Sequence, residues 1–278
     1  MATSNTTQNM AVFCDFENIA LGVRDAKYDK FDINKELERL LLKGSIVVKK
    51  AYCDWERYKA FKAAMHEASF ELIEIPHVRQ SGKNSADIRM VVDALDLCYT
   101  KSHVRTFVLI TGDSDFSPLV SKLRENDKIV IGVGVKKSTS DLLIANCDEF
   151  IYYDDLVREQ KPRRTARKKS AASAPAAEPV AERREEDKHK EEDRQHEAFD
   201  LVLSTLDALM AERGEDGKIW GSMIKQTLKR RRPGFSESYY GFKSFNALLE
   251  EAAARKLLTL ERDEKSGGYV VRPAPESG

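Results

Sequence analysis

Short apolar runs alternate with amphipathic stretches over roughly the first 158 residues of the chain. Runs typical of strands occupy 10–14, 45–52, 70–75, 106–111, 128–133 and 149–153. Between them, apolar residues recur at helical spacing over 33–42, 58–68, 84–99, 118–126 and 142–146. This alternation predicts an α/β domain over residues 1–160, with a mostly parallel sheet and helices on both faces.

The pattern changes after residue 160. Residues 161–196 begin with a basic run, continue through an Ala/Pro/Ser stretch and end in mixed charge, with no aromatic side chain. Such a segment buries too little apolar surface to offset the entropy of ordering it. We therefore expect a disordered linker, basic and then mixed in charge, whose last part can form a short solvated helix. Apolar periodicity resumes at residue 197.

Composition narrows the class of protein. Of 278 residues, 41% are hydrophobic, and 46 basic residues balance 46 acidic ones. A zero net charge excludes a basic footprint of the whole chain, so any nucleic-acid binding must come from local patches. No apolar run reaches the length of a membrane span and the N-terminus has no secretory pattern, so we expect a cytoplasmic protein with no membrane partner. The four cysteines form no CxxC pair, which argues against a zinc ribbon or a disulfide scaffold.

Acidic residues directly follow two of the predicted strands. Asp15 ends the first strand, and Gly112–Asp115 follows the fourth. The active sites of such sheets lie at the carboxyl ends of the strands, and strands one and four are neighbours in the common doubly wound orders. We therefore expect Asp15 and Asp113 to face each other across a crevice into which Asp115 also points. Asp87, near the start of the helix that leads into strand four, belongs to the same edge.

Each of these acids, taken alone, is explained equally well as a helix cap. Together they indicate a site, because clustered carboxylates are costly unless cations neutralise them. Oxygen-only ligand sets favour Mg²⁺ or Mn²⁺, and such ions can activate water for attack on a phosphodiester. By contrast, we expect Asp93, Asp96 and Asp127 to be plain solvated acids.

The first part of the chain resembles the NYN domain family, also called LabA-like, within the PIN-like nuclease superfamily. The resemblance covers about residues 9–158 and rests on Phe13–Ile19, Lys83–Asp87, Leu109–Leu119 and Ile144–Ile151. It implies a Rossmann-like, PIN-type fold and a metal-dependent ribonuclease, a hydrolase that cuts RNA phosphodiester bonds with Mg²⁺ or Mn²⁺ as cofactor.

Matching positions assign the roles that this resemblance implies. The metal-binding and catalytic acids become Asp15, Asp87, Asp113 and Asp115. The alternative for Asp115 is that it contacts the ligands of the metal and not the metal itself. Asn18 becomes a polar neighbour that orients a ligand or a water. Lys83 is a candidate phosphate contact, with simple solvation as the alternative.

The C-terminal part, residues 197–273, resembles the OST-HTH or LOTUS domain, a small winged-helix (α+β) domain. Helices over 199–211, 217–232 and 240–249 and a hairpin of 257–260 with 268–271 carry this resemblance, which implies RNA binding. The expected phosphate contacts are the six bases of an acid-free stretch: Lys218, Lys225, Lys229, Arg230, Arg231 and Arg232. One cation would satisfy a helix C-terminus, and the four in succession exceed that need.

We therefore expect a ribonuclease whose C-terminal module tethers RNA, single-stranded or structured, near an acidic cleft. One alternative is a non-catalytic RNA-binding regulatory protein of the same architecture. Another is a phosphohydrolase of the haloacid dehalogenase type, which the run Asp15–Ile19 disfavours because it lacks a second aspartate two residues after the first. A third is DNA as the substrate. No small-molecule cofactor is expected, and a homo-oligomer is compatible with the sequence.

Overall fold

The computed structural model describes residues 8–28, 31–75, 85–159, 180–213, 218–263 and 267–274. The chain divides into two compact units, Met1–Gln160 and Lys161–Gly278, and each has hydrophobic core residues of its own. Within the described ranges, no helix combines the length and the apolar character needed to cross a lipid bilayer.

Six parallel strands form the sheet of the N-terminal unit, in the order β3-β2-β1-β4-β5-β6. Their bounds are β1 Asn9–Asp15, β2 Ser45–Cys53, β3 Glu71–Glu74, β4 Val104–Ile110, β5 Ile129–Gly134 and β6 Glu149–Tyr152. Cys14 of β1 lies opposite Ala51 of β2 and opposite Ile110 of β4. The predicted parallel sheet is confirmed, and β1 and β4 are neighbours at its centre.

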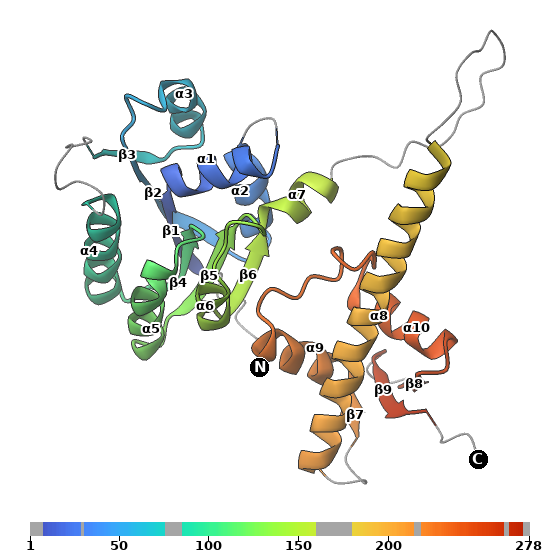
Figure 1. Ribbon diagram of the computed structural model, residues 1–278. Coiled ribbons are helices and arrows are strands. Elements are labelled where there is room, and N and C mark those ends of the chain that lie inside the picture. The colour runs from blue at the N-terminus through green and yellow to red at the C-terminus, as the bar shows by residue number, and fades with distance from the viewer. Residues whose placement is uncertain are drawn as a thin grey trace, which may run out of the picture. The chain divides into compact units, whose positions relative to one another are not determined.

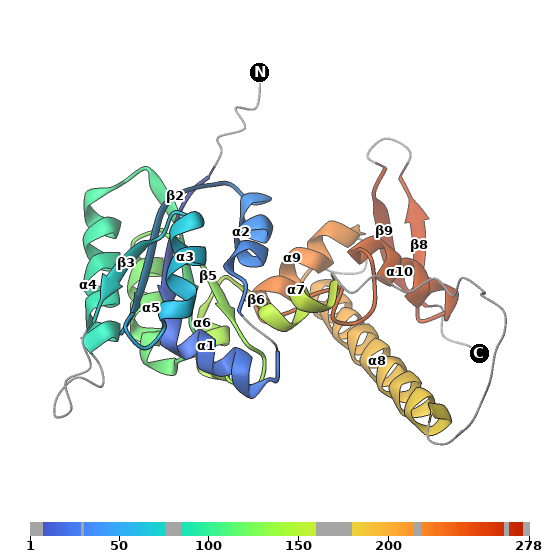
Figure 2. The same ribbon diagram turned by 90° about the horizontal axis from the view of Figure 1, so that it is seen from above.

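Helices cover both faces of this sheet (Figure 1, Figure 2). One face carries α1 (Phe16–Asp25), α2 (Ile33–Leu41), α3 (Lys59–Glu67) and α7 (Tyr153–Glu159), and the other carries α4 (Ser85–Thr100), α5 (Ser117–Glu125) and α6 (Asp141–Asn146). Alternate residues of β1 enter the two cores, Val12 and Cys14 on the first face and Ala11 and Phe13 on the second. Burial on both faces explains why β1 and β4 read as continuous apolar runs.

Helix α1 is absent from the elements that the sequence predicts. It begins directly after β1, and Asp15 is its N-cap. Gly22 weakens the helical pattern in the sequence because glycine is a poor helix former. In the structure this glycine allows close packing, since a Cβ atom on it would lie 2.4 Å from Ser138 Oγ. The chain therefore turns from strand into helix at the first acidic residue.

The C-terminal unit combines three helices with a small antiparallel sheet. Its elements are α8 (Val180–Arg213), β7 (Ile219–Trp220), α9 (Gly221–Arg231), α10 (Phe245–Ala254), β8 (Leu258–Arg262) and β9 (Tyr269–Pro273), and the strand order is β7-β9-β8. This succession of helices followed by a hairpin is that of a winged-helix domain, as predicted. Phe199, Phe242 and Phe245 are buried in its core.

Helix α8 starts earlier than the sequence predicts. It begins at Val180, inside the predicted linker 161–196, and continues without a break to Arg213. Glu, Lys and Arg are good helix formers, and the packed second half of the helix supplies the nucleus from which the charged first half extends. The basic start of the predicted linker lies outside the described residues.

Helix α10 starts later than predicted, at Phe245 in place of residue 240. Gly241 has a φ of 85°, which a right-handed helix does not allow. Ser244 is the N-cap, and its Oγ accepts a hydrogen bond from the backbone N–H of Ala247 at 3.1 Å. The aromatic residues before the cap form a turn that contributes to the core.

Candidate functional site at the carboxyl edge of the sheet

Asp15 lies where β1 ends and α1 begins. Its side chain is almost completely buried, with 8% of the residue exposed. Oδ1 accepts a hydrogen bond from the backbone N–H of Asn18 at 3.3 Å, as an N-cap does. The cap interpretation of Asp15 is therefore correct as far as it goes, and the other carboxyl oxygen remains for a different partner.

That partner is Thr111, which follows β4. Its hydroxyl donates to Asp15 Oδ2 at 3.2 Å and accepts from the backbone N–H of Asp113 at 3.2 Å. The side chain of Asn18 completes the link, because its Oδ1 accepts from the backbone N–H of Gly112 at 2.8 Å. Two hydrogen bonds thus join the ends of β1 and β4, and the third ties Asp113 to Thr111, so Asp15 and Asp113 are fixed in one place.

Gly112 is required at this turn for lack of space. A Cβ atom on it would lie 2.7 Å from the backbone oxygen of Ser138. The carbonyl of Gly112 accepts from the backbone N–H of Ser140 at 2.9 Å, so the chain after β5 packs directly on the turn. Any larger residue would push the segment after β5 away from this turn.

Asp113 and Asp115 follow in a short 3-10 turn, η1 (Ser114–Phe116). Asp113 is half-buried and caps the turn, with Oδ1 accepting from the backbone N–H of Asp115 at 2.9 Å. Asp115 itself is exposed. Asp113 therefore belongs to the wall of the site, and Asp115 lies at its rim.

Asp87 reaches the same edge from the first turn of α4 and is half-buried. Burial raises its pKa above the usual range, and the charges of Asp113, Asp115 and Glu17 raise it further. These mutual effects place Asp87 within electrostatic reach of both acids that follow β4. The structure thus brings together acids from three separate elements.

The electrostatics of Asp15 show the same clustering. Burial raises the pKa of its carboxyl, and with the charges of Asp87 and Asp113 the value reaches about 7. The hydrogen bonds from Asn18 and Thr111 act in the opposite direction and favour the ionised form. Asp15 is therefore a carboxylate that a nearby cation would strongly stabilise.

The donor set fits a hard divalent cation in its chemistry, because every side chain in it offers carboxylate oxygen. Neighbouring acids raise the pKa values of Asp15 and Asp87, and this is the effect that such a cation reverses. As they stand, no three histidine, cysteine or acidic side chains among the described residues are arranged so as to hold one ion. The edge supplies the donors of a metal site without a preformed cage.

Three residues at or near this edge are not predicted as site residues from the sequence. Thr111 joins the two strand ends, and no local pattern marks a strand-end threonine as a bridge. Glu17 forms an ion pair with Arg57, with 2.9 Å between Oε1 and Nη1, and its charge acts on Asp87. Its position two residues after Asp15 was the available signal.

Asp93 is the third, and its prediction as a solvated acid is wrong. Its side chain is only 12% exposed. It accepts hydrogen bonds from Tyr52 Oη at 2.9 Å, Arg89 Nε at 3.1 Å and Lys50 Nζ at 3.4 Å. Because Tyr52 and Lys50 belong to β2, Asp93 anchors α4, the helix that carries Asp87, to the sheet.

The predicted RNA-binding bases have different surroundings. Lys83 lies outside the described residues. Lys225 forms an ion pair with Glu237, with 2.8 Å between Nζ and Oε1. Burial raises the pKa of Glu237, but the charges of Lys225 and Lys229 outweigh this effect and the pKa is lowered. Four bases are exposed: Lys218, Arg230, Arg231 and Arg232. The structure therefore separates a charge used inside the C-terminal unit from a cationic surface at the end of α9.

Comparison with known proteins identifies the family of the N-terminal unit. The family model of the NYN domain matches residues 9–154. The Xenopus tropicalis protein "Meiosis regulator and mRNA stability factor 1" is 23% identical over 166 residues, which are 59% of this chain, and the chain spans about a tenth of that relative's length. A crystal structure of a Vibrio parahaemolyticus protein of unknown function covers 56% of this chain and 98% of its own, at 26% identity and a TM-score of 0.49. With more than half of its residues matched by the model, the chain belongs to the NYN domain family.

Proposed function

We propose that this protein is a metal-dependent ribonuclease that hydrolyses RNA phosphodiester bonds at the acidic edge of the N-terminal sheet. The observation that supports it best is the convergence of Asp15, Asp87 and Asp113 from three elements, with pKa values of Asp15 and Asp87 raised by burial and by neighbouring acids. Family membership supports the class of reaction, because NYN domains resemble PIN-like nucleases. The relative from Xenopus bears a name that refers to mRNA stability, which points to RNA as the substrate class.

In this proposal, Asp15, Asp87 and Asp113 hold Mg²⁺ or Mn²⁺, and exposed Asp115 contacts it through water. A bound ion of this kind activates a water molecule and neutralises charge on the phosphoryl group. Thr111 and Asn18 act as positioning residues, because their hydrogen bonds fix the ends of β1 and β4. The hydrogen bond from Thr111 also favours the ionised form of Asp15, because it opposes the rise in pKa that burial causes.

Cleavage of labelled single-stranded RNA in Mn²⁺ and in Mg²⁺, with an EDTA control, tests the reaction. We expect Asp113→Asn to lower the rate about a hundredfold or more, because loss of an anionic ligand removes several kcal/mol of charge stabilisation. Asp96→Asn is the matched control, an exposed acid on α4 that should leave the rate unchanged. Excess duplex DNA as competitor tests the preference for RNA.

Intact RNA in every lane, with binding still detectable, would contradict the ribonuclease. That result would favour the alternative of a non-catalytic RNA-binding regulatory protein with the same architecture. Cleavage that persists in EDTA or in Asp113→Asn would instead contradict the assignment of the site.

We also propose that the C-terminal unit is an RNA-binding domain of the OST-HTH type. The exposed Arg230, Arg231 and Arg232 at the end of α9 support it, because exposed guanidinium groups are available to phosphates. Replacing all three by glutamine should reduce the slope of log K against log salt by about 2, given roughly 0.7 per phosphate contact on single strands.

Lys225→Gln is the control for this charge effect. Its cation already pairs with Glu237 and lies 5.9 Å from the ring centroid of Phe245. We expect this variant to keep the salt slope and to lose stability instead. Equal slopes for the triple variant and the wild type, measured by fluorescence anisotropy, would argue against RNA contact at this surface.

A further inference from the structure

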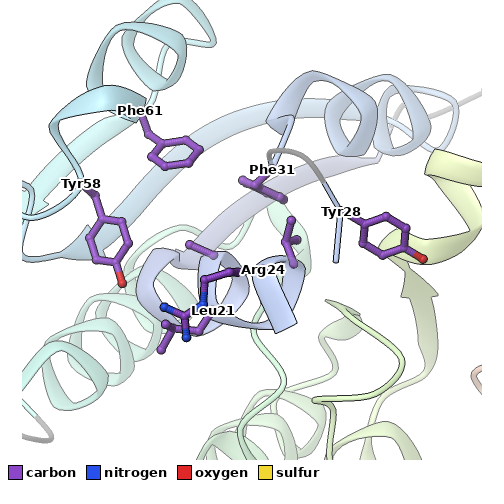
Figure 3. A pocket seen from close by; sticks show the side chains of 8 residues that line it. Leu21, Arg24, Tyr28, Phe31, Tyr58 and Phe61 are labelled. Carbon is purple, nitrogen blue, oxygen red and sulfur yellow. The ribbon is translucent and has the colours of Figure 1, made fainter. Parts of the chain in front are cut away.

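A pocket of about 240 Å³ opens between α1, the chain that follows it and the start of α3. Figure 3 shows the side chains around it, among them Tyr28, Phe31, Tyr58 and Phe61, with Arg24 of α1 nearby. Among the described residues, no acid lines this pocket. Sites for drug-sized ligands start near 300 Å³, so a space of this size suits a single flat ring.

The aromatic walls are held rigidly from behind by Phe16. Its fully buried ring meets Phe61, Tyr58 and Phe31 edge to face, with centroids 5.1, 5.5 and 5.9 Å away. Rings fixed in this way lose little freedom when a ligand binds. Because Phe16 follows Asp15 directly, the pocket and the acidic edge are built on consecutive residues.

Two guanidinium groups lie beside the pocket. Arg24 lines it with a side chain that is 73% exposed, and its ion pair with Asp25 is a weak surface pair. Arg57 lies 5.9 Å from the ring centroid of Tyr58 and pairs with Glu17. Burial and Glu17 raise the pKa of the Tyr58 hydroxyl, whereas both arginines lower it, so both charges act at this ring.

Aromatic walls with cations at the rim complement a nucleotide, whose base stacks on the rings while its phosphate meets the guanidinium groups. The distance also suits a strand that reaches the acids. Helix α1 leads from Asp15 to the lining residues Ala20–Arg24 over about 8–14 Å, at about 1.5 Å per residue. That span equals roughly two to four phosphates of a stacked strand.

We propose that this pocket binds a nucleobase of the RNA substrate a few nucleotides from the phosphate that is cleaved, with Arg24 and Arg57 beside the adjoining phosphate. The inference rests on the proposed ribonuclease function and adds a base-dependent subsite to it. Tyr58 and Phe61 supply the stacking surface.

Photocrosslinking tests the subsite on the full chain. A short RNA that carries thiouridine is irradiated with the protein in EDTA, which prevents metal-dependent cleavage, and crosslinked peptides are mapped by mass spectrometry. We expect crosslinks at Tyr58 and Phe61, and a yield about 5- to 150-fold lower in Tyr58→Leu, given the usual contribution of one stacked base. Tyr99→Leu is the matched control, an exposed tyrosine on α4 outside the pocket.

Arg24→Gln keeps the test valid even if Tyr58→Leu unfolds. Because Arg24 is exposed, its replacement should leave the melting temperature unchanged and lower the crosslink yield several-fold. A strand of abasic sites, with the same phosphates and no bases, should compete poorly for the pocket.

Crosslinks confined to the C-terminal unit, or full competition by the abasic strand, would overturn the subsite and leave the pocket to an apolar side chain of a protein partner. Cleavage in Mn²⁺ is scored separately. Crosslinks at Tyr58 without cleavage would support the pocket and contradict the ribonuclease. Cleavage without these crosslinks would support the ribonuclease and contradict the base-binding pocket.

Discussion

The edge of the N-terminal sheet and the core beneath α2 each bury a carboxyl group, and the two groups differ in their hydrogen-bond partners and charged neighbours. Asp15, at the edge, receives hydrogen bonds from Thr111 and Asn18 and has acidic neighbours. Glu36, on α2, is fully buried, and neither of its oxygens has a hydrogen-bond partner among the described residues. Burial raises both pKa values, to about 7 for Asp15 and about 8 for Glu36.

The comparison shows that burial alone does not make a site. Without donors or cations, Glu36 stays protonated at neutral pH and contributes little beyond its size. At the edge, donors hold Asp15 in place and other acids share its field, so the same raised pKa becomes an affinity for cations. Asp93 is a third case, in which Tyr52, Arg89 and Lys50 bind an acid completely and make it an anchor.

The largest expected effect comes from removing the unpartnered carboxyl with Glu36→Met. The unfolded chain releases this proton near pH 4.5 and the folded chain near pH 8, so wild-type stability falls as pH rises between these values. The full loss is about 4–5 kcal/mol. We expect the variant to be more stable by about 4–5 kcal/mol at pH 8, and by only about 1 kcal/mol near pH 5, where a mostly neutral polar group is removed.

Urea unfolding across this pH range measures the difference. Glu38→Met is the control, because Glu38 is exposed on the same helix. Parallel pH profiles for wild type and Glu36→Met would mean that Glu36 finds a partner in solution, and the contrast with Asp15 would then disappear.

A smaller effect is expected from Thr111→Val, which makes Asp15 resemble Glu36. The change keeps the shape of the side chain but removes the donor to Asp15 and the acceptor for the backbone of Asp113. We expect a loss of about 1–2 kcal/mol in the free energy of unfolding, because a buried carboxyl oxygen loses its partner. RNA cleavage should fall as well, since the two strand ends are no longer joined through this residue.

Thr106→Val, on β4 itself, is the control. Thr106 is equally buried, but its hydroxyl lies 3.5 Å from Gln8 Oε1, at the limit of a hydrogen bond. Equal losses of stability and cleavage in the two variants would show that any buried threonine in or next to β4 serves, and that Thr111 has no special role at the edge.

Much of the architecture was predictable from local pattern. Apolar runs of strand length gave the sheet, and acids directly after two of these runs indicated its functional edge, because parallel strands place their carboxyl ends together. The exposed arginines at the end of α9 were predictable in the same way, from a basic stretch without acids. Helix α1 was missed because a glycine obscured its pattern. The charged residues before residue 197 indicated only a short solvated helix, and they form the start of the continuous helix α8.

What the sequence by itself determined, then, is whatever depends on periodicity along the chain: the six strands of the N-terminal sheet, the C-terminal hairpin, most helices and the acidic strand ends. The short strand β7 was not among them, because it lies inside the helix predicted over 217–232. Only the tertiary structure decided which polar groups meet. Three contacts join residues that are far apart in the sequence: Thr111 with Asp15, Asp93 with Tyr52, and Lys225 with Glu237. Packing also leaves Glu36 without a hydrogen-bond partner among the described residues. The physical reason is that hydrogen bonds and ion pairs act over a few ångströms in space, and neighbours in space are set by packing and not by spacing along the chain.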